Sequence, residues 1–174
     1  MTPIAKRLRN TIIRHNNTLP GQARPVHYSD EWFTPSFIPE AIGPFDLDPC
    51  AGESSHARVN IRRPDDGLSI AWEGRVWLNP PYSTIDVWLD RLAAHGAGTA
   101  IVNARPETQW FQNAIEKAKA VFWLKGRVNF IRPDRIATNA PVGSCLIAYG
   151  DHDADALAAC TLPGRLMWLS ALRS

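Results

Sequence analysis

The residues with the clearest capacity for chemistry are Asn79-Pro80-Pro81-Tyr82, which follow the short apolar run of residues 76–78. That run predicts a buried strand, and the prolines end it because proline lacks the N–H that a central ladder needs. A residue that precedes proline favours extended backbone, so the chain leaves the sheet stiffly. The side-chain oxygen of Asn79, the carbonyl of Pro80 and the ring of Tyr82 together suit a planar ring that carries an amino group.

An exocyclic amino group on a nucleobase is a weak nucleophile because its lone pair is delocalised into the ring. Asn79 and Pro80 offer two acceptors for its hydrogens, which makes the lone pair more available. Stacking on Tyr82 contributes about 1–3 kcal/mol, once the base has left its duplex at a cost of roughly a few kcal/mol. With an electrophile held in line, positioning supplies most of the acceleration and no metal is required. The alternative is a strand-to-helix turn that uses its prolines only for stiffness.

A second polar stretch follows the strand expected at residues 45–48. Asp48 falls at the end of that strand, Pro49 breaks it, and Gly52 permits close approach of the backbone. A carboxylate there can pair with a cationic amino group or accept from ribose hydroxyls, although capping of a turn by Asp46 or Asp48 is equally open. Asp65-Asp66-Gly67 is typical of a turn, and a ligand contact is the second interpretation.

The pattern of apolar residues predicts an α/β fold. Strands alternate with helices, which indicates a mostly parallel sheet covered by helices on both faces. Ligands in such folds bind beyond the carboxyl ends of the strands, where Asp48 and Asn79 are both expected. We expect strands at 45–48, 57–61, 76–78, 99–103, 120–124, 144–149 and, at an edge, 166–169; helices over 34–43, 83–96, 107–119 and 155–160; and a long loop over 125–143.

The 174 residues suffice for one domain, and no apolar run approaches the roughly 18 residues of a membrane helix. The net charge is +2, and five cations precede the first acid, Asp30. We therefore expect a basic, flexible arm over residues 1–29 and one folded domain over 30–174. The arm either attracts phosphates or is a solvated tail. The cations are Lys6, Arg7, Arg9, Arg14 and Arg24.

The start of the chain lacks the apolar core of a signal peptide. The three cysteines, Cys50, Cys145 and Cys160, have no metal-like spacing and suit a reducing compartment. These features predict a cytoplasmic protein with no metal site and no membrane partner.

Four segments resemble those of a known family, the phage-type DNA N-6-adenine methyltransferases (Dam-like), and the resemblance spans about residues 28–150. In chain order they are Asp30-Glu31-Trp32-Phe33-Thr34-Pro35, Phe45-Asp46-Leu47-Asp48-Pro49-Cys50-Ala51, Asp65-Asp66-Gly67-Leu68 and Trp77-Leu78-Asn79-Pro80-Pro81-Tyr82-Ser83.

The resemblance implies a Rossmann-like methyltransferase fold that uses S-adenosylmethionine, acting in a bacterial or phage-infected host cell. It makes Asn79, Pro80, Pro81 and Tyr82 the catalytic segment. It places Thr34, Pro35, Asp48, Pro49, Cys50 and Asp66 at the cofactor.

The chain departs from methyltransferases at large in two ways. Its cofactor loop has one glycine, Gly52, and there is no separate target-recognition domain. Contacts to DNA are therefore expected from the basic arm or from the 125–143 loop. Arginine and asparagine suit guanine and adenine edges, and they serve equally as phosphate contacts. The candidates in the loop are Arg127, Asn129, Arg132 and Arg135.

The sequence thus predicts methyl transfer from S-adenosylmethionine to the amino group of adenine in DNA, after base flipping. The same segment could serve cytosine, RNA or a protein amide. A nucleic-acid-binding protein that has lost catalysis is the alternative from another class, and the intact Asn79-Pro80-Pro81-Tyr82 argues against it.

Overall fold

The computed structural model describes residues 32–53, 55, 57–131 and 137–169. The arm expected over residues 1–29 lies outside the described residues. The elements, in chain order, are α1 (Phe37–Glu40), β1 (Leu47–Asp48), β2 (Val59–Asn60), β3 (Val76–Leu78), the 3-10 helix η1 (Tyr82–Thr84), α2 (Ile85–His95), β4 (Gly98–Asn103), α3 (Gln109–Glu116), β5 (Ala120–Leu124), β6 (Asn129–Ile131), β7 (Ala137–Asn139), β8 (Ser144–Tyr149), α4 (Asp151–Ala159) and β9 (Gly164–Trp168).

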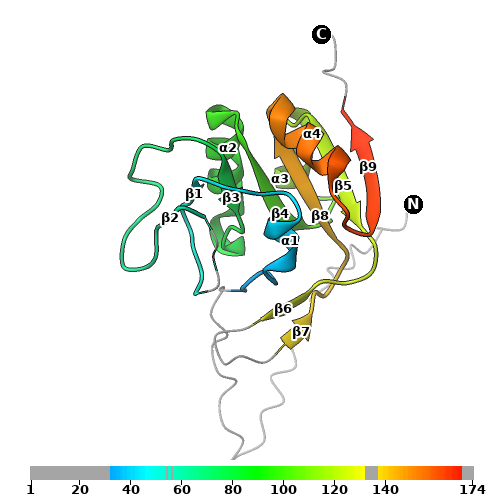
Figure 1. Cartoon of the computed structure of the whole chain (residues 1–174), viewed down its shortest axis with the longest axis horizontal. Coiled ribbons are helices and arrows are strands. Elements are labelled where there is room, and N and C mark those ends of the chain that lie inside the picture. The colour runs from blue at the N-terminus through cyan, green and yellow to red at the C-terminus, as the bar shows by residue number, and fades with distance from the viewer. Residues whose placement is uncertain (1–31, 54, 56, 132–136, 170–174) are drawn as a thin grey trace, which may run out of the picture.

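The described strands form a seven-stranded sheet in the order β2-β1-β3-β4-β8-β5-β9 (Figure 1). Strands β2, β1, β3 and β4 are parallel to one another. Strand β8 inserts between β4 and β5 and is antiparallel to both, and β9 is antiparallel to β5. The sheet is therefore mixed, and the expectation of a mostly parallel sheet holds for the half that carries Asp48 and Asn79.

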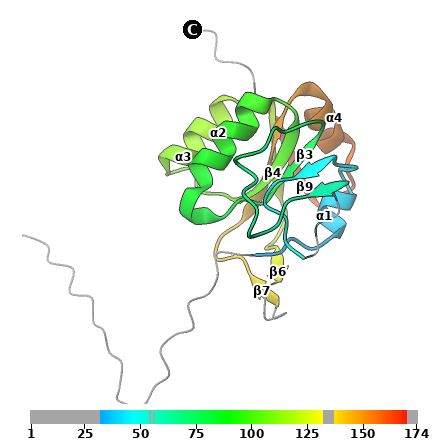
Figure 2. The same ribbon diagram turned by 90° about the vertical axis from the view of Figure 1, so that its left-hand side faces the viewer.

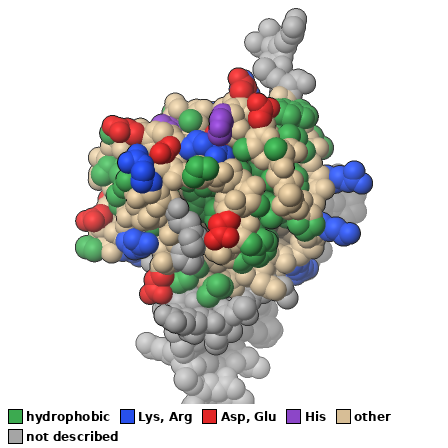
Figure 3. Space-filling view, viewed as in Figure 1, with side chains coloured by type: hydrophobic (Ala, Val, Ile, Leu, Met, Phe, Trp, Pro, Cys, Tyr) green, Lys and Arg blue, Asp and Glu red, His purple; other side chains and the backbone are tan. Residues whose placement is uncertain are grey.

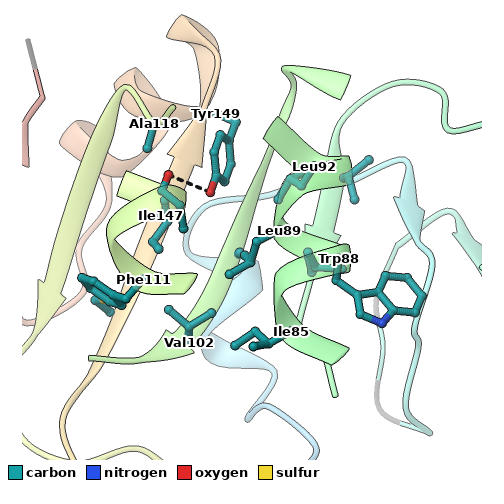
Figure 4. Packing of buried hydrophobic residues seen from close by; sticks show 14 of the residues in the cluster. Ile85, Trp88, Leu89, Leu92, Val102, Phe111, Ala118, Ile147 and Tyr149 are labelled. Carbon is teal, nitrogen blue, oxygen red and sulfur yellow. Dashed lines mark hydrogen bonds between the residues drawn. The ribbon is translucent and has the colours of Figure 1, made fainter. Parts of the chain in front are cut away.

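Helices cover both faces of the sheet, as the sequence predicts (Figures 1 and 2). Helices α2 and α3 pack on one face, and α1 and α4 contribute to a second apolar cluster on the other. The apolar side chains of α2 recur at helical spacing, so one stripe faces the strands (Figure 4). Gly96 ends α2 with a φ of 76°, a left-handed conformation that favours glycine. The α2 stripe consists of Ile85, Trp88, Leu89 and Leu92.

Several bounds differ from the sequence-based expectations. Helix α1 is a single turn that begins at Phe37, and α4 begins at Asp151 because Gly150 precedes it as N-cap. The region 125–143 is not a loop throughout, since it contains the hairpin of β6 and β7. That hairpin extends from the edge of the sheet at which the parallel strands end (Figures 1 and 2). Among the helices of the described ranges, none is long and apolar enough to cross a membrane.

A buried ion pair fixes the entry to β3. The guanidinium of Arg75 donates from Nε to Oδ1 of Asp153 on α4 at 2.9 Å, and Asp153 is only 1% exposed. The same guanidinium donates to the carbonyls of Ile42 and Pro44 and lies over the ring of Phe45. Arg75 thus joins α4 and the α1–β1 connection to the strand that leads to Asn79.

Replacing Arg75 by methionine leaves the carboxylate of Asp153 buried without its ion-pair partner. We expect Arg75→Met to lower the free energy of unfolding by about 3–5 kcal/mol in chemical denaturation. Lys117→Met is the matched control, because Lys117 pairs with Asp90 at 2.8 Å on the exposed surface and such pairs contribute roughly 1 kcal/mol or less. Equal losses in the two variants would contradict the assignment.

Candidate functional site

A cavity of 960 Å³ opens at the carboxyl ends of β1, β2 and β3. This volume lies near the upper end of the range of about 300–1,000 Å³ that is typical of ligand sites. Its walls come from the segment 32–34 and from the connections that follow these three strands. The cavity therefore occupies the edge of the sheet at which the sequence predicts a ligand.

Asp48 lies in the wall of the cavity at the end of β1, with its side chain buried. Its carboxylate accepts from the hydroxyl of Ser55 at 2.6 Å and from the backbone N–H of Cys50 at 3.1 Å. Burial raises the pKa of Asp48 to about 6, and the hydrogen bonds from Ser55 and Cys50 oppose this rise. Both oxygens of the carboxylate are thus hydrogen-bonded, and the effect of burial on the pKa still outweighs these bonds.

Asn79 follows β3 directly and is held at two points. Its main-chain carbonyl accepts from the thiol of Cys50 at 3.3 Å, which ties the β3 exit to the β1 loop. Its side-chain Nδ2 donates to the main-chain carbonyl of Trp32. Burial raises the pKa of the Cys50 thiol well above its ordinary value, so the thiol stays protonated and can donate. Asn79 and Asp48, 31 positions apart, therefore line one cavity.

The segment of residues 32–34 closes one side of the cavity and is anchored on two elements. Phe33 and Ile131 of β6 exchange backbone hydrogen bonds of 2.8 and 2.9 Å. The Phe33 ring packs on Gly52, where an added Cβ would lie 2.2 Å from it, so only glycine fits. Thr34 is buried, and its hydroxyl oxygen has no hydrogen-bond partner among the described residues.

The connection after β2 forms another part of the cavity wall. Gly67 approaches the carbonyl of Pro49 so closely that a Cβ would lie 1.8 Å from that oxygen. Asp66 accepts from the backbone N–H of Leu68 at 2.9 Å, which makes Asp65-Asp66-Gly67 a turn that also lines the cavity. Arg91 of α2 donates to the carbonyls of Leu68 and Ile70 and thereby fixes this wall.

The structure brings together most of the residues predicted at the cofactor. Thr34, Asp48, Pro49, Cys50 and Asp66 all line the cavity, whereas Pro35 does not. Asp46 serves elsewhere, because its Oδ2 accepts from the backbone N–H of Arg75 at 2.8 Å.

The structure places only part of the predicted catalytic segment, residues 79–82, at the cavity. Asn79 and Pro81 line the cavity, whereas Pro80 and Tyr82 are not among its lining residues. The Tyr82 hydroxyl accepts from the backbone N–H of Asn103 at 2.5 Å, and its ring meets Trp110 edge-on.

The predicted DNA contacts lie on or near the β6–β7 hairpin. Asn129 begins β6 and is exposed. Arg127 donates to the carbonyls of Ala140 and Pro141, so it supports the base of the hairpin. Arg132 and Arg135 lie outside the described residues. On the face drawn in Figure 3, the described basic and acidic side chains are interspersed.

Further residues at the cavity have roles that the sequence does not predict. The Trp32 carbonyl holds Asn79, and the Ser55 hydroxyl holds Asp48. Trp32 lies in one of the segments that resemble the family, but its main-chain carbonyl carries no signal of its own, and Ser55 lies in none of these segments. Arg62 and Arg63 line the cavity after β2, and Arg62 donates to the carbonyl of Gly52 at 3.2 Å. The pair of cations directly after an expected strand end is a signal that could have identified them.

Taken with the fold, this geometry defines an α/β protein with a cavity beyond the carboxyl ends of its parallel strands, which is where ligands bind in folds of this class. Residues 21–149 match the family model described as DNA N-6-adenine-methyltransferase (Dam), and the chain belongs to that family. The chain is similar to a DNA N-6-adenine-methyltransferase of Escherichia phage T1, at 25% identity over 135 residues. The match covers 71% of this chain but only 54% of the phage protein, so the chain spans about half the length of that relative. No solved structure matches the chain.

The raised pKa of Asp48 predicts a specific dependence of stability on pH. Between its ordinary value of 3.8 and about 6, the folded protein holds a proton on Asp48 that the unfolded chain has lost. The Asp48 contribution to the free energy of unfolding therefore falls as pH rises from about 4 to 6, by about 3 kcal/mol in total, and is constant above that window.

Asp48→Asn is nearly isosteric and does not titrate. We expect its stability relative to the parent to increase by about 3 kcal/mol from pH 4 to pH 7, measured by denaturation at a series of pH values. The subtraction removes the other titrating groups, which the two proteins share. Parallel stability curves for parent and variant would contradict the raised pKa.

Proposed function

We propose that this protein transfers a methyl group from S-adenosylmethionine to the exocyclic amino group of adenine in DNA. The observation that carries the proposal is the convergence of Asn79 and Asp48 on one cavity, with the Asn79 amide held by the Trp32 carbonyl. Family membership supplies the reaction class. Four neighbouring parallel strands, with helices on both faces, support a Rossmann-like methyltransferase fold.

The residues of the cavity fit the cofactor. S-adenosylmethionine is a cation with ribose hydroxyls, a purine and a carboxylate. Asp48 is a buried carboxyl able to pair with a cation or accept from hydroxyls. The Thr34 hydroxyl, which has no partner among the described residues, offers a further polar group to the ligand. Arg62 and Arg63 at the cavity suit the ligand's carboxylate. When bound, the cofactor supplies an electrophilic methyl group.

The chain's own contribution to the reaction is to orient the amino group. Asn79 accepts from one of its hydrogens through Oδ1, and the Pro80 carbonyl accepts from the other. Both are acceptors only, so they favour an amino group whose lone pair is directed at the electrophile. These interactions act on the reacting atom, and their strengthening in the transition state increases the rate.

Tyr82 is proposed to stack on the flipped adenine. In the described structure its hydroxyl is bonded to Asn103 and its ring contacts Trp110. A stacking role therefore requires the ring to turn toward the cavity when the base enters. The extrusion of the base from the duplex costs about a few kcal/mol, and stacking offsets that cost.

A nucleic-acid-binding protein that keeps this fold without catalysis is the second candidate. Methyl transfer separates the two. Incubation with tritiated S-adenosylmethionine and DNA, followed by digestion to nucleosides, shows whether N6-methyladenine, N4-methylcytosine or neither is formed.

Asn79→Ala and Asp48→Asn should affect different steps. Asn79→Ala removes an acceptor from the reacting group, so methyl transfer should fall by orders of magnitude while affinity for S-adenosylmethionine stays within about threefold. Asp48→Asn removes a charged partner of the cofactor, so its affinity should weaken by about 10- to 100-fold. Calorimetry measures affinity, and tritium transfer measures the rate.

Asn113→Ala, on the exposed surface of α3, is the control for both measurements. If Asn79→Ala transfers methyl groups at the parental rate, Asn79 has no catalytic role. If the dissociation constant for S-adenosylmethionine is unchanged in Asp48→Asn, Asp48 does not contact the cofactor.

Arg132 and Arg135 are proposed to contact DNA phosphates, since they connect β6 to β7 in the chain. The double variant Arg132→Ala/Arg135→Ala should weaken DNA binding. It should also flatten the plot of log affinity against log salt by about 0.9 for each lost phosphate contact. Fluorescence anisotropy at several salt concentrations measures both quantities.

Arg165→Ala is the matched control, because Arg165 is an exposed cation on β9, an edge strand of the seven-stranded sheet and not part of the hairpin. If the double variant and the control bind DNA alike at every salt concentration, Arg132 and Arg135 make no contact. A loss that differs between DNA sequences would assign base reading to them instead.

A further inference from the structure

The side chain of Asn79 is oriented by a group that can only accept hydrogen bonds. Its Nδ2 donates to the main-chain carbonyl of Trp32. An asparagine amide has one donating and one accepting end, and a carbonyl matches only the donating end. The contact therefore turns Nδ2 toward Trp32 and leaves Oδ1 on the other branch of the amide.

The Trp32 carbonyl is itself held in place by its neighbour. Phe33 makes two backbone hydrogen bonds to Ile131 of β6, at 2.8 and 2.9 Å. The ring of Phe33 fills the space above Gly52 on the β1 loop, where no side chain fits. The acceptor that faces Asn79 is thus anchored to the hairpin on one side and to the β1 loop on the other.

The main chain of Asn79 is fixed as well. Its carbonyl accepts from the Cys50 thiol, which fixes the main chain, while the bond to Trp32 fixes the side-chain amide. Groups that are locked in this way before the substrate arrives lose little entropy when it binds. Such an arrangement requires both ends of the amide, one for positioning and one for the substrate.

We propose that the main-chain carbonyl of Trp32 is the positioning group for Asn79, and that it makes asparagine, rather than aspartate, the residue that this site requires. The inference rests on the proposed function for the role of Oδ1. A carboxylate also accepts from an amino group, so the reaction alone does not distinguish the two side chains. The Trp32 carbonyl distinguishes asparagine from aspartate, because an ionised carboxylate has no hydrogen to donate to it.

The substitution Asn79→Asp therefore places a carboxylate oxygen against the carbonyl oxygen of Trp32. Their repulsion is relieved when the new carboxyl is protonated, since the acid form donates to Trp32 and keeps one oxygen for the substrate. The variant should regain activity as pH falls. The other charged or titratable groups around the cavity are shared with the parent protein, and they are Asp48, Cys50, Glu53, Arg62, Arg63, Asp65 and Asp66.

The experiment measures the maximal rate of methyl transfer to DNA for the parent, Asn79→Asp and Asn79→Ala from pH 5.5 to 8.5. The ratio of each variant to the parent cancels the shared titrations. We expect the Asn79→Asp ratio to be at least about tenfold below one at pH 8 and to rise as pH falls, by up to about tenfold per unit. The Asn79→Ala ratio should be low and independent of pH.

A second readout needs no activity. The new carboxyl should make Asn79→Asp less stable than the parent at pH 8, and the difference in denaturation midpoint should shrink as pH falls, because protonation restores the bond to Trp32. Asn79→Ala should show a constant difference.

A ratio for Asn79→Asp that does not change with pH, whether high or low, together with a constant difference in stability, overturns the positioning role. A parent that methylates no adenine overturns the proposed function instead. The stability arm still tests the contact between Trp32 and position 79 in that case.

Discussion

The parallel register of β1 and β3 is the constraint on which the site depends. Leu47 pairs with Val76, so the two strands end at the same edge of the sheet and deliver Asp48 and Asn79 to one cavity. The Cys50 thiol then joins the two exits by bonding to the Asn79 carbonyl. Because side chains alternate between the two faces of a strand, a slip of one residue would exchange the buried faces of β3. The same strand register therefore places Asn79 at the cavity and the apolar side chains of β3 in the core.

Backbone groups give the cavity much of its shape. Carbonyls of Trp32, Leu68 and Ile70 accept the hydrogen bonds that hold Asn79 and the wall after β2. Gly52 and Gly67 each stand where a Cβ would collide with the neighbouring segment. The edge of the sheet has little regular structure of its own, so close backbone approach replaces the ladder as the source of rigidity. This arrangement suits a site that must orient small groups without bulky side chains.

The sequence predicts those elements whose residues show a clear apolar pattern or a characteristic end residue. Strand β5 and strand β8 have the expected bounds, and α2 ends at Gly96 as its pattern indicates. The sequence does not predict the hairpin of β6 and β7, because residues 125–143 contain Arg, Asn and Pro without an alternating period. Asp48 and Asn79 could be placed at one edge from strand order alone. The Trp32 carbonyl could not, since every residue has a carbonyl and only tertiary structure selects one.

The position of β8 has a consequence for how the chain reaches its native state. This strand completes the middle of the sheet. It pairs with β4, from which residues 104–143 separate it in the chain, and with β5 on its other side. Until residues 144–149 have left the ribosome, β4 and β5 both present open edges to other chains. Such long-range pairing also slows folding, because the entropy of closing the loop is lost before the stabilising strand contacts form. During synthesis, the nascent protein therefore depends on residues 144–149 to protect the edges of β4 and β5 from aggregation.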